Sequence, residues 1–308
     1  MSAPKVVVVG GGGVGTSVAF NLLLLARGYR VVVVDPNASK VVSHVMDLQQ
    51  TIVQGGVGTA RAGDDQDVAT ADVLVVSAAT PLTVNTSRTV YLDDNAAIVG
   101  SIFDRLPSGW DGVAIMVTNP VDILCTWLCR ERGFDRRRLL GYTLNDSLRL
   151  RTGVADALGD VAPEAVEAWV LGEHGDLCVP LLDRIAVEGR PVRLTAGQEG
   201  LAVEFVRTWY ARHVALDSGR SSTWTSGLGV ARMVDAVCFG TDDTWVASVF
   251  LEGEYGVDGA SLTVPVSLVP GGLGEILDWP LAPSQYDGMR AAAESVARAA
   301  DSVALLPR

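Results

Sequence analysis

The fold of this protein is decided by residues 6–17, which read V-V-V-V-G-G-G-G-V-G-T-S. The four valines form a short apolar run, typical of a parallel strand buried on both faces. Gly10, Gly12 and Gly15 then satisfy G-x-G-x-x-G, and an apolar helical pattern follows. In such a connection the first glycine permits a tight turn, the second lets the backbone approach a pyrophosphate, and the third allows close helix–strand packing. We therefore predict a dinucleotide-binding turn whose helix N-terminus faces the phosphates.

An acidic residue at the expected distance supports this prediction. Residues 30–34 read R-V-V-V-V as a second buried strand, and Asp35 follows it, about 20 residues after the glycine motif. A carboxylate at this position binds both ribose hydroxyls and repels a 2′-phosphate, so the sequence predicts NAD in preference to NADP. The alternative is an ordinary strand–helix–strand turn with an acid placed there by chance.

Two further buried strands are predicted at residues 71–77 and 112–117, with a helix over residues 96–106 between them. Apolar strands that alternate with helices predict an α/β fold with a Rossmann-type doubly wound parallel sheet. Ligands of such sheets bind at the C-terminal ends of the strands. The segments that follow the strands, including residues 78–88 and 118–120, are therefore candidate binding segments.

Composition and charge restrict the class of partner. The chain of 308 residues is long enough for two domains with substantial cores. Its net charge of −12 argues against a nucleic-acid partner, because phosphate backbones bind to basic faces. We expect a cytoplasmic protein without a membrane partner, because no apolar run approaches the ~20 residues that span a bilayer and the N-terminus lacks signal-peptide organisation. The four cysteines form no C-x-x-C pair, so reduced thiols and no metal are expected.

Residues 170–180 read V-L-G-E-H-G-D-L-C-V-P and place His174 in a glycine-bounded turn after an apolar run. Such a placement suits proton transfer, but by itself a surface turn explains the stretch equally well. The other two histidines, His44 and His213, lie in helical patterns without partner motifs, so we expect both to be structural.

The second half of the chain mixes strands with helices, which predicts an α+β substrate domain over residues 144–308 after a dinucleotide-binding domain over residues 1–143. The predicted helices are 147–158, 199–215, 227–239 and 284–306, and the predicted strands are 165–171, 183–187, 244–252 and 261–268.

Taken in order along the whole chain, the glycine motif, Asp35 and several further motifs resemble the lactate/malate dehydrogenase family. The further motifs are M-D-L at 46–48, S-R at 87–88, V-T-N-P-V-D at 117–122, D-S-L-R at 146–149, G-E-H-G-D at 172–176 and G-E-Y-G at 253–256. Each is weak by itself, but this many in the right order are highly specific.

The resemblance implies a catalytic or substrate-binding role for five residues. His174 would exchange a proton with the substrate oxygen, and Asp146 would accept a hydrogen bond from the other imidazole nitrogen. Arg149 would hold the substrate carboxylate with its planar guanidinium fork. Arg88 would lie on a closing loop and polarise the carbonyl as charge develops on its oxygen. Asn119 would lie beside the substrate and the nicotinamide ribose, and its bond to the following proline is expected to be cis.

The residues expected to contact NAD lie at the ends of the parallel strands. They are Gly10, Gly12, Gly13, Val14, Gly15, Asp35, Ala78, Ala79, Asn95, Val117 and Asn119. Reduction of a 2-oxo acid requires a hydride donor, a proton donor, and cations for a carboxylate and a developing alkoxide. NAD, His174, Arg149 and Arg88 would supply one of each. Without the resemblance, Asp146 and Arg149 could equally be a surface ion pair, and Arg88 a solvated charge.

The chain departs from the family pattern around the substrate. Leu82 stands six residues before Arg88, where the resemblance implies glutamine for lactate and arginine for malate. Leucine cannot pair with a second carboxylate, so an apolar substrate side chain is predicted. Ala79 replaces a glycine expected beside the cofactor. Thr223 resembles the threonine that borders the substrate side chain, and the neighbouring Trp224 could reshape the pocket.

We expect an NAD-dependent 2-hydroxy-acid dehydrogenase with a non-standard apolar 2-oxo or 2-hydroxy acid as substrate, working as a homodimer or homotetramer. The alternatives within the same chemistry are an ordinary lactate or malate dehydrogenase, and a biosynthetic-pathway reductase of a tailored keto or imino acid. An alternative of another class is a catalytically idle NAD-binding interaction protein, against which the intact set of Asp146, Arg149 and His174 argues.

Overall fold

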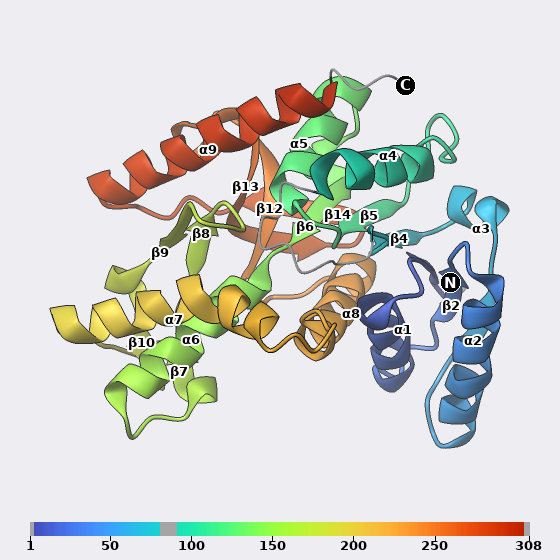
Figure 1. The fold of residues 1–308 in the computed structure, drawn as a ribbon, viewed down its shortest axis with the longest axis horizontal. Helices are drawn as coiled ribbons and strands as arrows, with labels where there is room; N and C mark the ends of the chain where they lie inside the picture. Colours follow the sequence, from blue (N-terminus) through green and yellow to red (C-terminus); the bar gives the residue numbers. More distant parts are fainter. Residues whose placement is uncertain (1–2, 81–90, 305–308) are drawn as a thin grey trace.

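A parallel sheet forms the centre of the first half of the chain in the computed structural model, which describes residues 3–80 and 91–304 (Figure 1). Its strand order is β3-β2-β1-β4-β5-β6. The bounds are β1 Lys5–Val9, β2 Arg30–Val34, β3 Thr59–Ala62, β4 Val73–Val76, β5 Val113–Met116 and β6 Leu139–Tyr142. This is the order of doubly wound dinucleotide-binding sheets, whose ligand crevice lies at the strand ends where the order reverses, between β1 and β4. The predicted α/β class and Rossmann-type sheet are confirmed.

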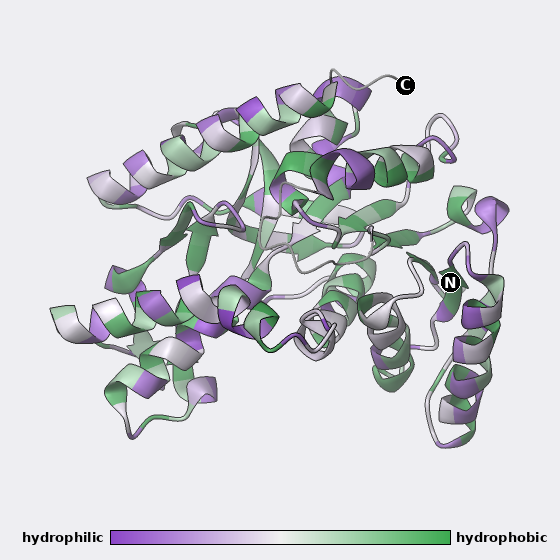
Figure 2. Cartoon of the chain, viewed as in Figure 1, coloured by the Kyte–Doolittle hydropathy of each residue, from purple (hydrophilic) through white to green (hydrophobic). Residues whose placement is uncertain are grey.

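Helices flank this sheet because its strands are apolar on both faces. The valines of β1 and β2 are buried, and Val7 pairs with Val32 on one side and with Leu74 on the other. The helices are α1 Gly13–Leu24, α2 Ala38–Val53, α3 Asp65–Ala69, α4 Leu92–Phe103 and α5 Val121–Arg132. In Figure 2 the central strands are mostly green, whereas the outer helix α2 alternates between green and purple, as expected for a helix with one buried face.

The sheet continues without a break into the second half of the chain. β6 pairs in parallel with β5 and antiparallel with β12, and the order then runs β12-β13-β8-β9, with β14 beside β13. A separate small sheet has the order β11-β10-β7. The bounds are β7 Val166–Glu167, β8 Val170–Gly172, β9 Cys178–Pro180, β10 Ala186–Val187, β11 Arg190–Pro191, β12 Trp245–Glu252, β13 Asp258–Val269 and β14 Gly272–Ile276. The domain boundary predicted after residue 143 falls just after β6.

The single strand predicted over residues 165–171 is wrong. The segment forms two strands, of which β7 pairs with β10 in the small sheet and β8 pairs with β13 and β9 in the large one. Ala168 and Trp169 carry the chain from one sheet to the other. Apolar patterning could not reveal this change, because it depends on which distant strand satisfies each backbone N–H and C=O.

Four longer helices complete the second half: α6 Leu144–Leu158, α7 Ala196–Ala215, α8 Thr223–Phe239 and α9 Pro283–Ala304. α7 packs on α6, α8 packs on α1, and α9 lies along α5 and β13 (Figure 1). The packing of α8 on α1 brings the second half of the chain against the glycine loop. Among the residues that the structure describes, no helix has the length and apolar character that crossing a membrane requires.

Candidate active site

The glycine loop between β1 and α1 has the shape that its motif predicts. Gly10 has a φ of +112°, and a Cβ there would lie 2.5 Å from the backbone nitrogen of Ala78. A Cβ on Gly15 would lie 2.0 Å from the carbonyl oxygen of Gly10, so helix and strand approach too closely for a side chain. Around Gly12 the space is open, which leaves room for a pyrophosphate at the N-terminus of α1. The loop therefore fits the phosphates of a dinucleotide.

Asp35 follows β2 and is fixed beside this loop. Its Oδ2 accepts a hydrogen bond from the backbone N–H of Gly11 at 2.7 Å, and its Oδ1 accepts one from that of Asn37 at 2.9 Å. An ionised carboxylate has about four acceptor sites, so two such bonds orient it and leave capacity for ribose hydroxyls. The position and chemistry of Asp35 fit the ribose of NAD.

Asn95 of α4 joins the ends of two neighbouring strands. It is buried, its Oδ1 accepts a hydrogen bond from the backbone N–H of Thr80 at 2.8 Å, and its Nδ2 donates to the carbonyl oxygen of Asn119 at 2.7 Å. The peptide bond between Asn119 and Pro120 is cis, as predicted. Asn95 thereby fixes the turn after β5 relative to the residues that follow β4.

His174 lies in the turn of the β8–β9 hairpin, and its backbone is bound by a residue of helix α5, which follows strand β5. Its N–H donates to Oδ2 of Asp122, in the first turn of α5, at 2.6 Å. Burial raises the pKa of the Asp122 carboxyl to about 6, and contacts with Ser248 and His174 oppose that effect. A buried carboxyl thus anchors the turn that carries the histidine.

Asp146, in the first turn of α6, connects the histidine ring to an arginine. Its Oδ2 lies 2.5 Å from Nδ1 of His174, and its Oδ1 accepts a hydrogen bond from Nη1 of Arg149 at 2.8 Å. The three side chains are only 10–11% exposed. The pairing through Nδ1 directs Nε2 away from Asp146. One carboxylate therefore orients both a proton-transfer group and a cation that can bind a carboxylate.

His174 and Arg149 line a cavity of about 250 Å³, whereas Asp146 lies behind them and does not line it. From the predicted set, the cavity brings together Val14, Ala79, Asn95, Val117, Asn119, Arg149 and His174. Its wall is completed by residues that sequence reasoning did not select, among them Tyr142, Asn145, Trp209, Tyr210, Ser222 and Ser226. Two predicted residues, Leu82 and Arg88, lie outside the described residues.

The structure does not bring Thr223 into this cavity. The hydroxyl of Thr223 donates to the carbonyl oxygen of Ser221 and lies beside Gly13. The cavity is lined instead by Ser222 and Ser226, which are one helical turn apart. Trp224 is 69% exposed and is also absent from the cavity lining. Successive helix residues point about 100° apart. Thr223 therefore faces a different side of the helix from Ser222 and Ser226, although it adjoins Ser222 in the sequence.

A hydrogen-bonded chain that the sequence did not reveal supports the cavity from α6 to α8. The hydroxyl of Tyr142 donates to Oδ1 of Asn145 at 3.0 Å, and Nδ2 of Asn145 donates to the hydroxyl oxygen of Ser226 at 2.9 Å. The sequence signal was weak, because Tyr142 and Asn145 adjoin Asp146 but Ser226 is distant in the chain.

Within residues 3–80 and 91–304, no cluster of three or more His, Cys, Asp or Glu side chains is placed to hold a metal ion.

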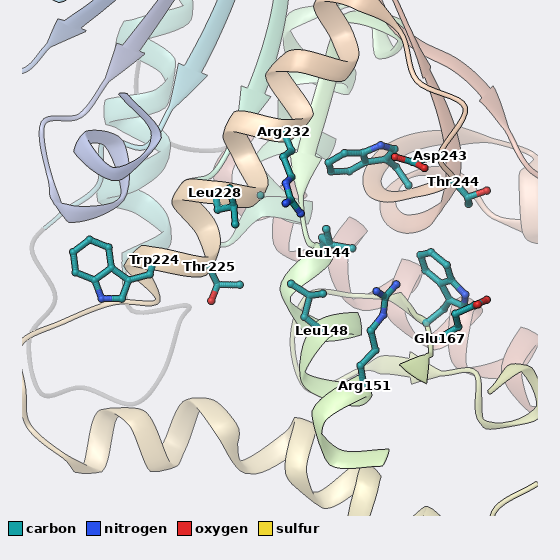
Figure 3. A pocket seen from close by; sticks show the side chains of 13 residues that line it. Leu144, Leu148, Arg151, Glu167, Trp224, Thr225, Leu228, Arg232, Asp243 and Thr244 are labelled. Carbon is teal, nitrogen blue, oxygen red and sulfur yellow. The ribbon is translucent and has the colours of Figure 1, made fainter. Parts of the chain in front are cut away.

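A second, larger cavity of about 660 Å³ shares no lining residue with the first. In Figure 3, Arg151 of α6 and Arg232 of α8 point toward one another across it, with Leu144 and Leu148 between them. Its lining from α8 includes Thr225, Leu228 and Arg232, and neither His174 nor Arg149 lines it.

Comparison with known proteins gives consistent matches over nearly the whole chain. The NAD-binding domain of lactate/malate dehydrogenase matches residues 4–141, and the α/β C-terminal domain of the same family matches residues 143–304. An L-lactate dehydrogenase of Lactobacillus delbrueckii subsp. bulgaricus is 32% identical over 305 residues, which cover 97% of this chain and 99% of that protein.

Solved structures agree with these matches. The minor L-lactate dehydrogenase of Enterococcus mundtii, in a ligand-bound form, is 27% identical with a TM-score of 0.89 over 99% of both chains. The lactate dehydrogenase of Cryptosporidium parvum, complexed with lactic acid and NAD, has a TM-score of 0.92 over the full length of both chains. At 23% identity, that last likeness concerns the fold alone.

Proposed function

The chain belongs to the lactate/malate dehydrogenase family and is an NAD-dependent 2-hydroxy-acid dehydrogenase, and we propose that its substrate is a 2-oxo acid with an apolar side chain. The catalytic part of this proposal rests on one observation. Asp146 joins His174 to Arg149 at the wall of the cavity that the cofactor-side residues Val14 and Val117 also line.

In the reducing direction, Arg149 binds the substrate carboxylate and so places the 2-oxo carbon between the histidine and the cofactor side of the cavity. NADH, when bound, supplies the hydride that adds to this carbon. His174 gives a proton to the carbonyl oxygen, which becomes the hydroxyl, and Asp146 holds the ring through Nδ1 in the orientation for this transfer. In the oxidising direction His174 takes the proton back. We assign polarisation of the carbonyl to Arg88 from its place in the sequence motif.

The substrate part of the proposal rests on Leu82. The resemblance to the family assigns selection of the substrate side chain to this position, and leucine there offers no charge for a second carboxylate. In a closed site, a carboxylate without a partner costs about 1–3 kcal/mol or more, which is roughly tenfold to a hundredfold in kcat/KM. Oxaloacetate should therefore be a poor substrate.

A steady-state assay with NADH and a panel of 2-oxo acids tests this proposal. We expect pyruvate and 2-oxoisocaproate to be reduced with a higher kcat/KM than oxaloacetate. Leu82→Arg should shift preference toward oxaloacetate, and Leu82→Gln, which adds polarity without charge, is the matched control. If oxaloacetate is the better substrate of the wild-type protein, the inference from Leu82 is wrong.

An ordinary L-lactate dehydrogenase is the second candidate, because the 32% identical relative bears that name. Pyruvate would then exceed every longer 2-oxo acid in the same panel. An imino-acid reductase would instead need an amine in the assay, and an idle NAD-binding protein would reduce nothing in it.

We also propose that the protein works as a homodimer or homotetramer in the cytoplasm. Support for oligomerisation comes from large exposed apolar side chains on α1 and α2, where Leu24 is 53%, Met46 63% and Val53 79% exposed. Light scattering after size-exclusion chromatography measures the mass, and a monomer at micromolar concentration would contradict this proposal.

A further inference from the structure

Trp209, near the C-terminal end of α7, lies against the arginine that we assign to the substrate carboxylate. Cζ of Arg149 lies 4.1 Å from the indole centroid. Asp146 holds one edge of the same guanidinium at 2.8 Å. The guanidinium is thus in contact with both a carboxylate and an aromatic ring, a combination that suits the planar arginine better than lysine.

The indole also lies between two cavities. Trp209 lines the 250 Å³ cavity that contains His174, and it lines a neighbouring cavity of about 150 Å³. Behind it the smaller cavity is walled by Leu148, Thr152, Phe205 and Thr225. Asn145, Arg149 and Ser222 also line both cavities, so the indole is one part of the partition between them. Removal of the indole would open that part and extend the catalytic cavity toward Leu148 and Phe205.

A stacked histidine holds the indole in this position and is itself bound to a neighbouring segment. The ring of His213, one helical turn along α7, stacks on it at 5.0 Å with an interplanar angle of 11°. Nε2 of His213 lies 2.9 Å from the carbonyl oxygen of Arg220, in the segment that leads to Ser222. His213, which we expected to be structural, thus connects the indole to a segment that lines the catalytic cavity.

We propose that Trp209 limits the size of the substrate side chain that the site accepts and positions the guanidinium of Arg149. Its indole closes the catalytic cavity off from the space beside Phe205, so that a 2-oxo acid with a short or narrow side chain fits and a bulky one does not. Its face keeps the guanidinium of Arg149 in the orientation that binds the carboxylate. This inference rests on the proposed function, because it names the side chain that the same site accepts.

The test compares kcat/KM for phenylpyruvate and for pyruvate, with NADH, in the wild-type protein and in Trp209→Ala. We expect the phenylpyruvate-to-pyruvate ratio to rise about tenfold or more, since size discrimination in such pockets is typically 10–200-fold. For pyruvate, KM should rise about tenfold with a smaller change in kcat, because the positioning of Arg149 affects carboxylate binding. The inhibition constant of oxamate, a planar carboxylate analogue of pyruvate, should rise by the same factor.

Trp209→Phe keeps an aromatic face but removes part of the volume, so it should restore much of the pyruvate KM and give an intermediate ratio. Trp209→Phe also tests the proposal by itself if Trp209→Ala fails to fold. Leu201→Ala is the matched control, because Leu201 belongs to the same helix, is exposed and lines neither cavity. A ratio unchanged in both Trp209 variants, while the wild-type protein reduces 2-oxo acids, overturns this inference and leaves the proposed function intact. A wild-type protein that reduces no 2-oxo acid overturns both.

Discussion

Replacement of Asp146 by asparagine removes the charge that connects His174 to Arg149 and keeps the shape of the side chain. Asp146 makes two charge-assisted contacts, at 2.5 Å to Nδ1 of His174 and at 2.8 Å to Nη1 of Arg149. Contacts of this kind contribute roughly 1.5–3 kcal/mol each. If both act in the transition state, kcat/KM should fall by roughly 10²–10⁴, at about 1.4 kcal/mol for each factor of ten. The two partners bind to different oxygens of Asp146, and asparagine replaces one of these oxygens with an NH₂ donor, so the histidine tautomer or the arginine orientation is lost.

The assay is the steady-state rate of NADH oxidation with a 2-oxo acid, together with the Kd of NADH from fluorescence titration. The Kd should stay within about threefold, because Asp146 is not among the groups assigned to the cofactor. Asp287→Asn is the matched control. It removes a carboxylate from an Arg290 pair with the same i,i+3 spacing, but both side chains are largely exposed, and such pairs contribute little. A fall below about tenfold in Asp146→Asn, or an equal fall in the control, would refute the role assigned to Asp146.

Three further predictions concern the same site. His174→Asn should reduce kcat by at least about a hundredfold while NADH binding persists, because general acid–base groups typically contribute 10²–10⁴-fold; turnover near the wild-type rate would remove His174 as the proton donor. Asp35→Ser should lower the preference for NADH over NADPH, measured as the ratio of kcat/KM for the two cofactors, because the carboxylate no longer repels a 2′-phosphate; an unchanged ratio would place the ribose elsewhere. The pKa of the buried Asp122 carboxyl is raised from its ordinary value of 3.8 to about 6, so the folded state holds the proton more tightly than the unfolded state, and stability falls as pH rises through that window. Asp122→Asn lacks this titration, so its free energy of unfolding relative to the wild type should rise by up to ~3 kcal/mol between about pH 4 and 6 and level off above; chemical denaturation at several pH values measures this, and a difference independent of pH would contradict it.

The first half of the fold could be predicted because its signals are local. Val6 to Val9 must be buried on both sides, and glycines at positions 10 and 15 meet a steric demand set within a single strand–turn–helix unit. The signal of Asp35 is also local, because this residue directly follows the next strand and its carboxylate accepts a hydrogen bond from the glycine loop. Short apolar strands alternating with helices allow few arrangements other than a doubly wound sheet.

Strand pairing in the second half could not be predicted in the same way. Residues 165–171 have an apolar pattern that fits one strand, yet they divide between two sheets. The partners that decide this, β10 and β13, lie later in the chain, and only the assembled structure brings their backbone groups alongside.

By itself, the sequence determined the glycine loop, the acid Asp35 after the second strand and the order of Asp146, Arg149 and His174 along the chain, because each depends on a residue type at a fixed spacing. Only the tertiary structure decided which side chains meet. It brought Asp146 to His174 across 28 positions in the sequence, turned Ser222 and not Thr223 toward the cavity, and laid Trp209 of another helix on Arg149. The physical reason is that spacing fixes the face of a helix or strand, whereas the packing of α6, α7, α8 and the β8–β9 hairpin fixes what that face contacts.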